Sequence, residues 1–190
     1  TKITNDGLKP LSGLTDLREI DLAATRISDA GLEHLATLDS LEELRLVGTR
    51  IRGPGFDALS DLPNLRMLRL GVLKMSDKEM KHLAGLVRLE TLEFLGAKIK
   101  GPGLEHLAGM TQLTTLNLRS AKLDDAGLAY FPDLPSLRNL NLSSTNITDA
   151  GLEHLEGLLD LQTLDLTRTD VTAEGVAKLK EVLTNTKITY

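Results

Sequence analysis

The chain has 190 residues, of which 41% are hydrophobic, 26% charged and 3% aromatic, and its formal net charge is −5 at pH 7. An acidic chain poor in aromatic residues lacks the features of a nucleic-acid binder, so we do not expect nucleic acid as its partner. The absence of cysteine excludes disulfides, thiol catalysis and Cys-ligated zinc. No apolar run approaches the roughly 18 residues of a membrane span, and no signal peptide is visible, so we expect a soluble chain without a membrane segment.

A pattern of 24 residues repeats along almost the whole sequence without insertion or deletion. We number the seven full units repeats 1 to 7, from 17–40 through 161–184, and count positions 1 to 24 within each. The shared pattern is LxxLxLxxTxIxDxGLxxLxxL. One such unit cannot bury its own apolar face, so stacked units are predicted to share a continuous core. The leucines at position 1 are Leu17, Leu41, Leu65, Leu89, Leu113, Leu137 and Leu161.

This pattern resembles the leucine-rich repeat family, whose units begin LxxLxLxx followed by Asn or Cys. It is similar to the ribonuclease-inhibitor-like superfamily, as seen in short-repeat bacterial proteins and in the repeat region of F-box proteins. The resemblance implies an α/β fold. It would be a right-handed solenoid, with one parallel sheet on the concave face and short helices on the convex face. It also implies a role in recognition of other proteins.

Position 9 departs from the family pattern, because Thr, Leu or Ala replaces the usual Asn or Cys. We expect the threonine hydroxyls to bond the backbone of the neighbouring turn. The three apolar residues in mid-chain can only pack. The residues at position 9 are Thr25, Thr49, Leu73, Ala97, Ala121, Thr145 and Thr169.

The predicted elements follow the repeat from end to end and form one solenoid domain, 1–190. Residues 1–16 match the later part of a unit, without its strand, and are expected to expose apolar residues such as Ile3, Leu8 and Leu14. Such an end is typical of a domain cut from a longer protein, or of one that stacks on another subunit. Residues 173–183 read as a longer helix, and 185–190 as a closing eighth strand.

Two kinds of helix start occur along the chain. Asp29, Asp77, Asp125 and Asp149 occupy position 13 and are predicted to cap the first turn of their own helix. Repeats 2 and 4 carry Gly-Pro-Gly there instead, and proline suits a first helical position. The helices are predicted to be about eight residues long. They should end near the glycines of the following turn, which are Gly85, Gly109 and Gly157.

The four histidines, His34, His82, His106 and His154, share position 18. His82 and His106 could in principle hold a metal, but no third ligand accompanies them, and a solvent-facing helix position explains all four. No nucleophile and base stand in a recognisable pattern. We therefore predict no catalytic residue, no metal, no cofactor and no enzymatic activity.

Side chains at positions 3, 5 and 7 are predicted to point out from the exposed sheet face, because strand side chains alternate. In the middle repeats this face mixes apolar side chains with arginines, which is typical of a protein interface. We expect a scaffold that binds another protein there. Alternatives are a substrate-recognition or inhibitor module of a larger protein. The predicted contact residues are Arg45, Val47, Met67, Arg69, Thr91, Glu93, Leu95, Asn117 and Arg119.

Position 10 carries a basic residue in repeats 1 to 5 and at Lys2. Stacking would place these charges about 5 Å apart, which costs roughly 0.8 kcal/mol per neighbouring pair in water before salt screening. A solvated edge whose long stems cover apolar atoms is one interpretation. The other is a basic edge that binds an acidic patch or another anionic ligand. This basic edge comprises Arg26, Arg50, Lys74, Lys98 and Lys122.

Overall fold

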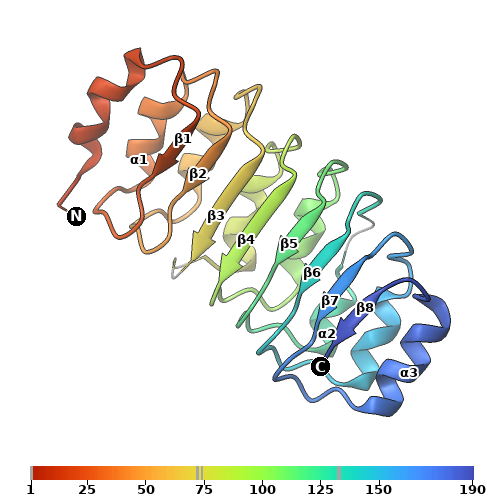
Figure 1. Ribbon diagram of the computed structural model, residues 1–190. Helices are drawn as coiled ribbons and strands as arrows, with labels where there is room; N and C mark the ends of the chain where they lie inside the picture. The colour runs from red at the N-terminus through yellow and green to blue at the C-terminus, as the bar shows by residue number, and fades with distance from the viewer. Residues whose placement is uncertain (1, 72, 74, 132–133) are drawn as a thin grey trace.

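The computed structural model describes residues 2–71, 73, 75–131 and 134–190. Eight strands form one parallel sheet in the order β1 to β8, with the helices packed behind it (Figure 1). This arrangement confirms the predicted α/β solenoid. The strands are β1 (Glu19–Asp21), β2 (Glu43–Arg45), β3 (Met67–Gly71), β4 (Thr91–Leu95), β5 (Thr115–Asn117), β6 (Asn139–Asn141), β7 (Thr163–Asp165) and β8 (Lys187–Thr189).

The strand register follows the repeat without slippage. Ile20 pairs with Leu44, Leu44 with Leu68, and each later pair is again one repeat apart. Equivalent positions of successive repeats therefore lie in rows across the sheet. The inward rows are leucine, isoleucine or phenylalanine, and burial of these side chains supplies the main driving force for stacking.

The elements behind the sheet are shorter and tighter than predicted, because most are 3-10 helices. A 3-10 helix rises about 2.0 Å per residue, against 1.5 Å for an α-helix, so it spans the back of a 24-residue coil with fewer residues. They are η1 (Asn5–Gly13), α1 (Asp29–Leu32), η2 (Glu33–Leu35), η3 (Pro54–Leu59), η4 (Asp77–Leu83), η5 (Pro102–Leu107), α2 (Asp125–Leu128), η6 (Asp149–Leu155) and α3 (Ala173–Val182).

The predicted glycine stops are wrong in detail. η4, η5 and η6 end at Leu83, Leu107 and Leu155, two residues before each glycine. Those glycines do not adopt the left-handed conformation of a glycine helix cap, since the positive-φ glycines lie elsewhere. They occupy the turn that returns the chain to the next strand.

The N-terminal segment covers more apolar surface than the sequence suggests. Ile3 and Leu14 are exposed, at 39% and 51%, but Leu8 is buried at 1%. The prediction for Leu8 was wrong because η1 packs against α1 and η2 of repeat 1 and places that side chain in the shared core.

The threonines at position 9 bond within their own turn. The Thr25 hydroxyl donates to the Leu22 carbonyl at 2.7 Å, and the Thr145 hydroxyl to the Leu142 carbonyl at 2.6 Å. The predicted bond to a neighbouring turn was wrong. Each hydroxyl instead donates to the backbone carbonyl three residues before it in the same turn. Leu73, Ala97 and Ala121 are buried at this position, as expected.

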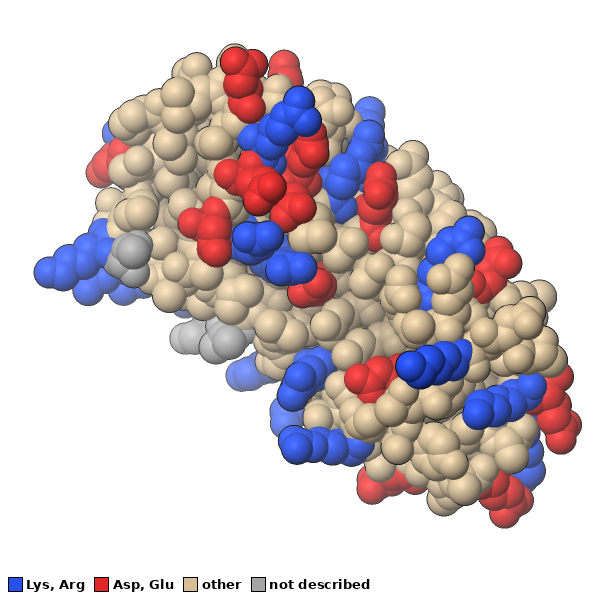
Figure 2. Space-filling model, viewed as in Figure 1, with Lys and Arg blue, Asp and Glu red and all other residues tan. Residues whose placement is uncertain are grey.

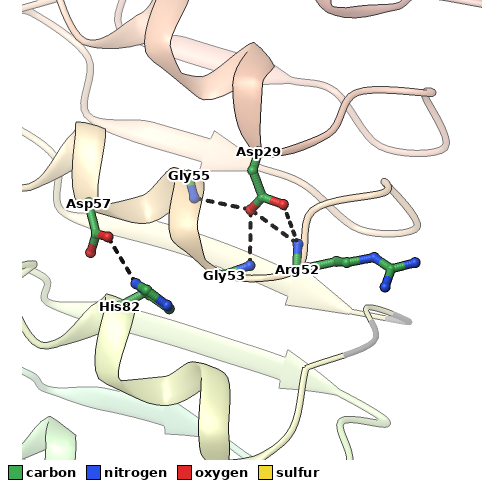
Figure 3. Close-up of polar contacts among 6 residues, drawn as sticks. All are labelled: Asp29, Arg52, Gly53, Gly55, Asp57 and His82. Atoms are coloured by element: carbon green, nitrogen blue, oxygen red, sulfur yellow. Dashed lines mark hydrogen bonds and ion pairs between the residues drawn. The ribbon is translucent and has the colours of Figure 1, made fainter.

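The aspartates at position 13 connect one repeat to the next. Asp29 Oδ1 accepts backbone N–H bonds from Gly53 and Gly55, each at 3.0 Å, and a further bond comes from Arg52 (Figure 3). Asp77 Oδ1 likewise accepts backbone N–H bonds from Lys100, Gly101 and Gly103. Each of these two carboxylates therefore caps the start of a helix, but that helix belongs to the following repeat. Each helix's own N-cap residue comes one position earlier in these repeats, at Ser28, Ser76, Asp124 and Thr148.

Glycine at position 15 makes this approach possible. A Cβ on Gly55 would lie 2.6 Å from the Asp29 carbonyl oxygen, and one on Gly103 would lie 2.6 Å from the Asp77 Cα. Real Cβ atoms do not tolerate such distances to backbone. The Gly-Leu pair of the repeat therefore serves the junction between coils as well as the helix.

At the junction between repeats 6 and 7, hydrogen bonds from the next coil lower the pKa of one of these aspartates. The Thr172 hydroxyl donates to Asp149 Oδ2 at 2.6 Å and, with the Thr172 N–H, lowers the pKa of Asp149. A folded pKa below the unfolded one stabilises the fold above the unfolded pKa, and this contribution is lost as pH falls through the folded pKa. We expect Thr172→Val to raise the pKa of Asp149 toward its ordinary value, measured by NMR titration of the carboxyl carbon. The pKa of Asp6, which Lys9 lowers, is the internal control and should not move. An unchanged Asp149 would contradict this cause.

Candidate functional site

Positions 3, 5 and 7 form three rows on the outer face of the sheet. Viewed on this face, Figure 2 shows acidic and basic side chains crowded over β1 to β4 and few over the later strands. The charged residues of the three rows in β1 to β4 are Glu19, Asp21, Glu43, Arg45, Arg69 and Glu93. The face is therefore divided into a charged half and a mostly neutral, polar half.

Position 5 has a structural role in four of the seven repeats. An Asp or Asn there accepts the backbone N–H two residues on, which closes the turn at the end of the strand. The four bonds, each 2.9 or 3.0 Å, join Asp21 to Ala23, Asn117 to Arg119, Asn141 to Ser143 and Asp165 to Thr167. The sequence interpretation missed this role, although the recurrence of Asx two residues before a turn was a usable signal.

Repeats 2, 3 and 4 lack this bond and carry Arg45, Arg69 and Glu93 at position 5. Arg45 and Arg69 are directly paired in register, so two like charges are neighbours. Arg45 Nη2 lies 2.9 Å from Glu43 Oε2, and Arg69 Nε lies 3.3 Å from Glu93 Oε1. The Nε atoms of both arginines are buried without a hydrogen-bond partner, since the Arg69 ion pair is not aligned as a hydrogen bond. The fold gains nothing evident from these side chains.

Apolar side chains lie beside this charged row. A Cβ on Gly71 would meet Leu95 Cβ at 2.9 Å and Val47 Cγ1 at 3.2 Å, so the glycine lets Val47 and Leu95 close over the strand between them. Leu95 is 36% exposed, and Val47 is half-buried. Met67, predicted to be exposed, is also half-buried, because it lies between neighbouring side chains of its row.

The other predicted contact residues divide between the two halves. Thr91 and Glu93 are half-buried and lie beside the arginines on β4. Asn117 is half-buried and engaged in its turn, while Arg119 is exposed. We define the sheet patch as the part of this face on β2 to β4, made of Arg45, Val47, Met67, Arg69, Thr91, Glu93 and Leu95.

The basic edge lies where the strands end. Arg26, Arg50, Lys98 and Lys122 are all exposed, whereas Lys74 lies outside the described residues. Within the described ranges, the ion pairs of the protein involve other side chains and none reaches these four. Their charged groups are therefore available for contact with an external ligand.

The histidines do not gather into a metal site. His34, His82 and His106 are half-buried and only His154 is exposed, so the predicted solvent-facing position is partly covered. His82 Nδ1 lies 2.9 Å from Asp57 Oδ2 of the preceding repeat (Figure 3). In the part of the chain that is described, no group of three or more His, Asp or Glu side chains is placed to hold a metal ion. No helix there combines the length and apolarity needed to cross a membrane.

Comparison with known proteins agrees with this geometry. Leucine rich repeat family models match residues 13–36 and 111–171. The chain is a leucine-rich repeat protein. No curated protein matches this leucine-rich repeat protein in sequence.

Solved structures show the same fold at low identity. An internalin C2 from Listeria monocytogenes matches with a TM-score of 0.67 at 20% identity, over 98% of this chain and 84% of that one. Another internalin from the same bacterium matches with a TM-score of 0.64 at 22% identity, over 95% and 56%. A leucine-rich repeat protein of Leptospira interrogans matches with a TM-score of 0.55 at 17% identity, over 96% and 57%. This leucine-rich repeat protein therefore spans just over half the length of two of these three chains.

Proposed function

We propose that this leucine-rich repeat protein is a binding scaffold that holds another protein on its sheet patch and performs no catalysis. The observation that carries the proposal is the exchange at position 5. Four repeats use an Asp or Asn there to close a turn, and three consecutive repeats give up that bond for Arg45, Arg69 and Glu93. Three adjacent coils that lack this turn-closing bond and carry charged side chains in its place are best explained by an external partner.

The composition of the sheet patch suits a protein surface. Apolar Val47 and Leu95 lie beside Arg45 and Arg69, and arginine with apolar neighbours is common where interfaces concentrate their binding energy. The Arg45 and Arg69 side chains are 34% and 38% exposed, so a partner carboxylate could accept hydrogen bonds from the exposed part of each guanidinium group. The fold supports the same reading, because leucine-rich repeats commonly mediate protein–protein interaction.

A second candidate is that the chain is the recognition or inhibitor module of a larger protein. Two of the similar solved chains are much longer than the part this protein covers, which makes that organisation reasonable. The finer placement among ribonuclease-inhibitor-like repeats and F-box proteins remains a prediction from the repeat pattern. Both candidates use the same sheet patch.

The test replaces Val47 and Leu95 together with aspartate. Two carboxylates at the centre of the patch should weaken partner binding at least tenfold, because they put unpaired charge into a desolvated contact. Partners are captured from the native source and identified by mass spectrometry, and their affinity for purified wild-type and variant protein is then measured by calorimetry.

The matched control replaces Thr163 and Thr189 with aspartate. Both are exposed, lie on β7 and β8, and add the same charge far from the patch. We expect this control to bind like the wild type. Equal binding by all three proteins would refute the sheet patch. A sharp fall in melting temperature confined to the patch variant would show that these side chains support the core instead.

A further inference from the structure

The basic edge holds a single row of cations, which Lys2 extends toward the N-terminus. Lys2, Arg26, Arg50, Lys98 and Lys122 share one repeat position and all are exposed, while Lys74, between Arg50 and Lys98, lies outside the described residues. At about 4.8 Å per strand, the five spacings from Lys2 to Lys122 span about 24 Å. In Figure 2 blue side chains lie along the lower left margin, where the strands of Figure 1 end.

Asp29 and Asp77, three residues after position 10 of their repeats, form no ion pair with the described side chains of this edge. Asp29 accepts backbone N–H bonds of Arg52, Gly53 and Gly55, and Figure 3 shows the Arg52 guanidinium directed away from that carboxylate. Asp77 is likewise bonded to the backbone of the next coil. These two carboxylates are engaged at the junctions between repeats, which leaves the exposed basic side chains of the edge available to a ligand.

The edge is also narrow. It is one residue wide along the repeat, at position 10. The protein as a whole is acidic, with a net charge of −5, which disfavours a large polyanion such as a nucleic-acid duplex or an anionic membrane surface. The edge carries no aromatic side chain, so it offers no platform on which the bases of a single strand could stack.

We propose that the basic edge binds an extended acidic segment of a polypeptide that runs across the ends of the strands. An extended chain advances about 3.3 Å per residue, so seven or eight residues span the row. Carboxylates on such a chain are within reach of the flexible Lys and Arg stems. A single row of cations suits a ligand that is one chain wide. This binding is independent of the sheet patch.

The probe is fluorescein-labelled decaglutamate, and its binding is followed by fluorescence anisotropy. The edge variant carries Arg26→Glu, Arg50→Glu, Lys98→Glu and Lys122→Glu. The matched control makes the same charge change at four exposed sites away from the edge, Lys81→Glu, Arg88→Glu, Arg138→Glu and Lys180→Glu. We expect decaglutamate to bind the wild type and to lose at least tenfold in affinity between 50 and 300 mM NaCl. We expect a loss of at least tenfold in the edge variant and less than threefold in the control.

Two further arms decide the class of ligand. Single-stranded (dT)10 and vesicles with 30% phosphatidylserine are expected to bind the wild type more weakly than decaglutamate does, and the reverse order would overturn the acidic-peptide assignment. Equal losses in the edge variant and the control would reduce the effect to net charge, and absence of binding at 50 mM NaCl would also refute it. If the edge variant does not fold, the same four sites are changed to glutamine. Val47→Asp with Leu95→Asp should leave decaglutamate affinity within threefold, which keeps this test separate from that of the sheet patch.

Discussion

Replacing Leu116 with alanine is expected to lower the free energy of unfolding by about 2–5 kcal/mol. Leu116 is fully buried in β5 and lies in register between Leu92 and Leu140. The change removes apolar burial and leaves a cavity between three consecutive coils. Each coil contacts only its neighbours, so the defect weakens both stacking interfaces at once. Urea unfolding followed by circular dichroism measures the loss.

Leu159→Ala is the matched control, since Leu159 is 69% exposed and makes the same chemical change outside the core. We expect it to alter the free energy of unfolding by less than about 0.5 kcal/mol. A loss at Leu116 no larger than that at Leu159 would contradict the assignment of the inward rows.

Replacing Asp77 with alanine is expected to cost about 2–3 kcal/mol, well above the usual effect of an exposed aspartate. The carboxylate accepts N–H bonds from Lys100, Gly101 and Gly103 at 2.9 to 3.2 Å. Gly101 and Gly103 are buried, so their donors would lose a charged acceptor in a place that water reaches poorly. The same urea unfolding experiment measures the effect.

Two variants sharpen that experiment. Asp61→Ala removes an exposed carboxylate of the preceding repeat and should be nearly neutral. Asp77→Asn keeps an acceptor oxygen without the charge and should lie between the two. If Asp77→Ala matches Asp61→Ala, the bonds between repeats contribute no stability.

The sequence predicted the sheet well because its signal is strictly periodic. One register slip would turn every leucine outward, so the inward rows specify the pairing by themselves. The polar bonds were not predictable in the same way. Whether Thr25 bonds its own turn, or Asp29 the next coil, depends on distances between chain segments that adjoin only after stacking.

The candidate site was partly predictable. Alternation placed Arg45, Arg69 and Leu95 on the outer face, which the structure shows. It could not show that Gly71 lets Val47 and Leu95 close together, or that the Nε atoms of both arginines lack a partner. Those features depend on the depth of each side chain among its neighbours, and strand alternation carries no information on depth.

The aspartate bonds between coils do not run the whole length of the molecule. Position 13 is Gly53 in repeat 2 and Gly101 in repeat 4, and the helix starts that follow use their own Glu79 and Asp124. These bonds join the repeats into three blocks, which are repeats 1 and 2, repeats 3 and 4, and repeats 5 to 7. We call the two boundaries without such a bond seams, and the Asp57–His82 contact bridges the first of them. The sheet patch on β2 to β4 crosses that first seam. A partner bound there would hold together two blocks that no aspartate at position 13 joins.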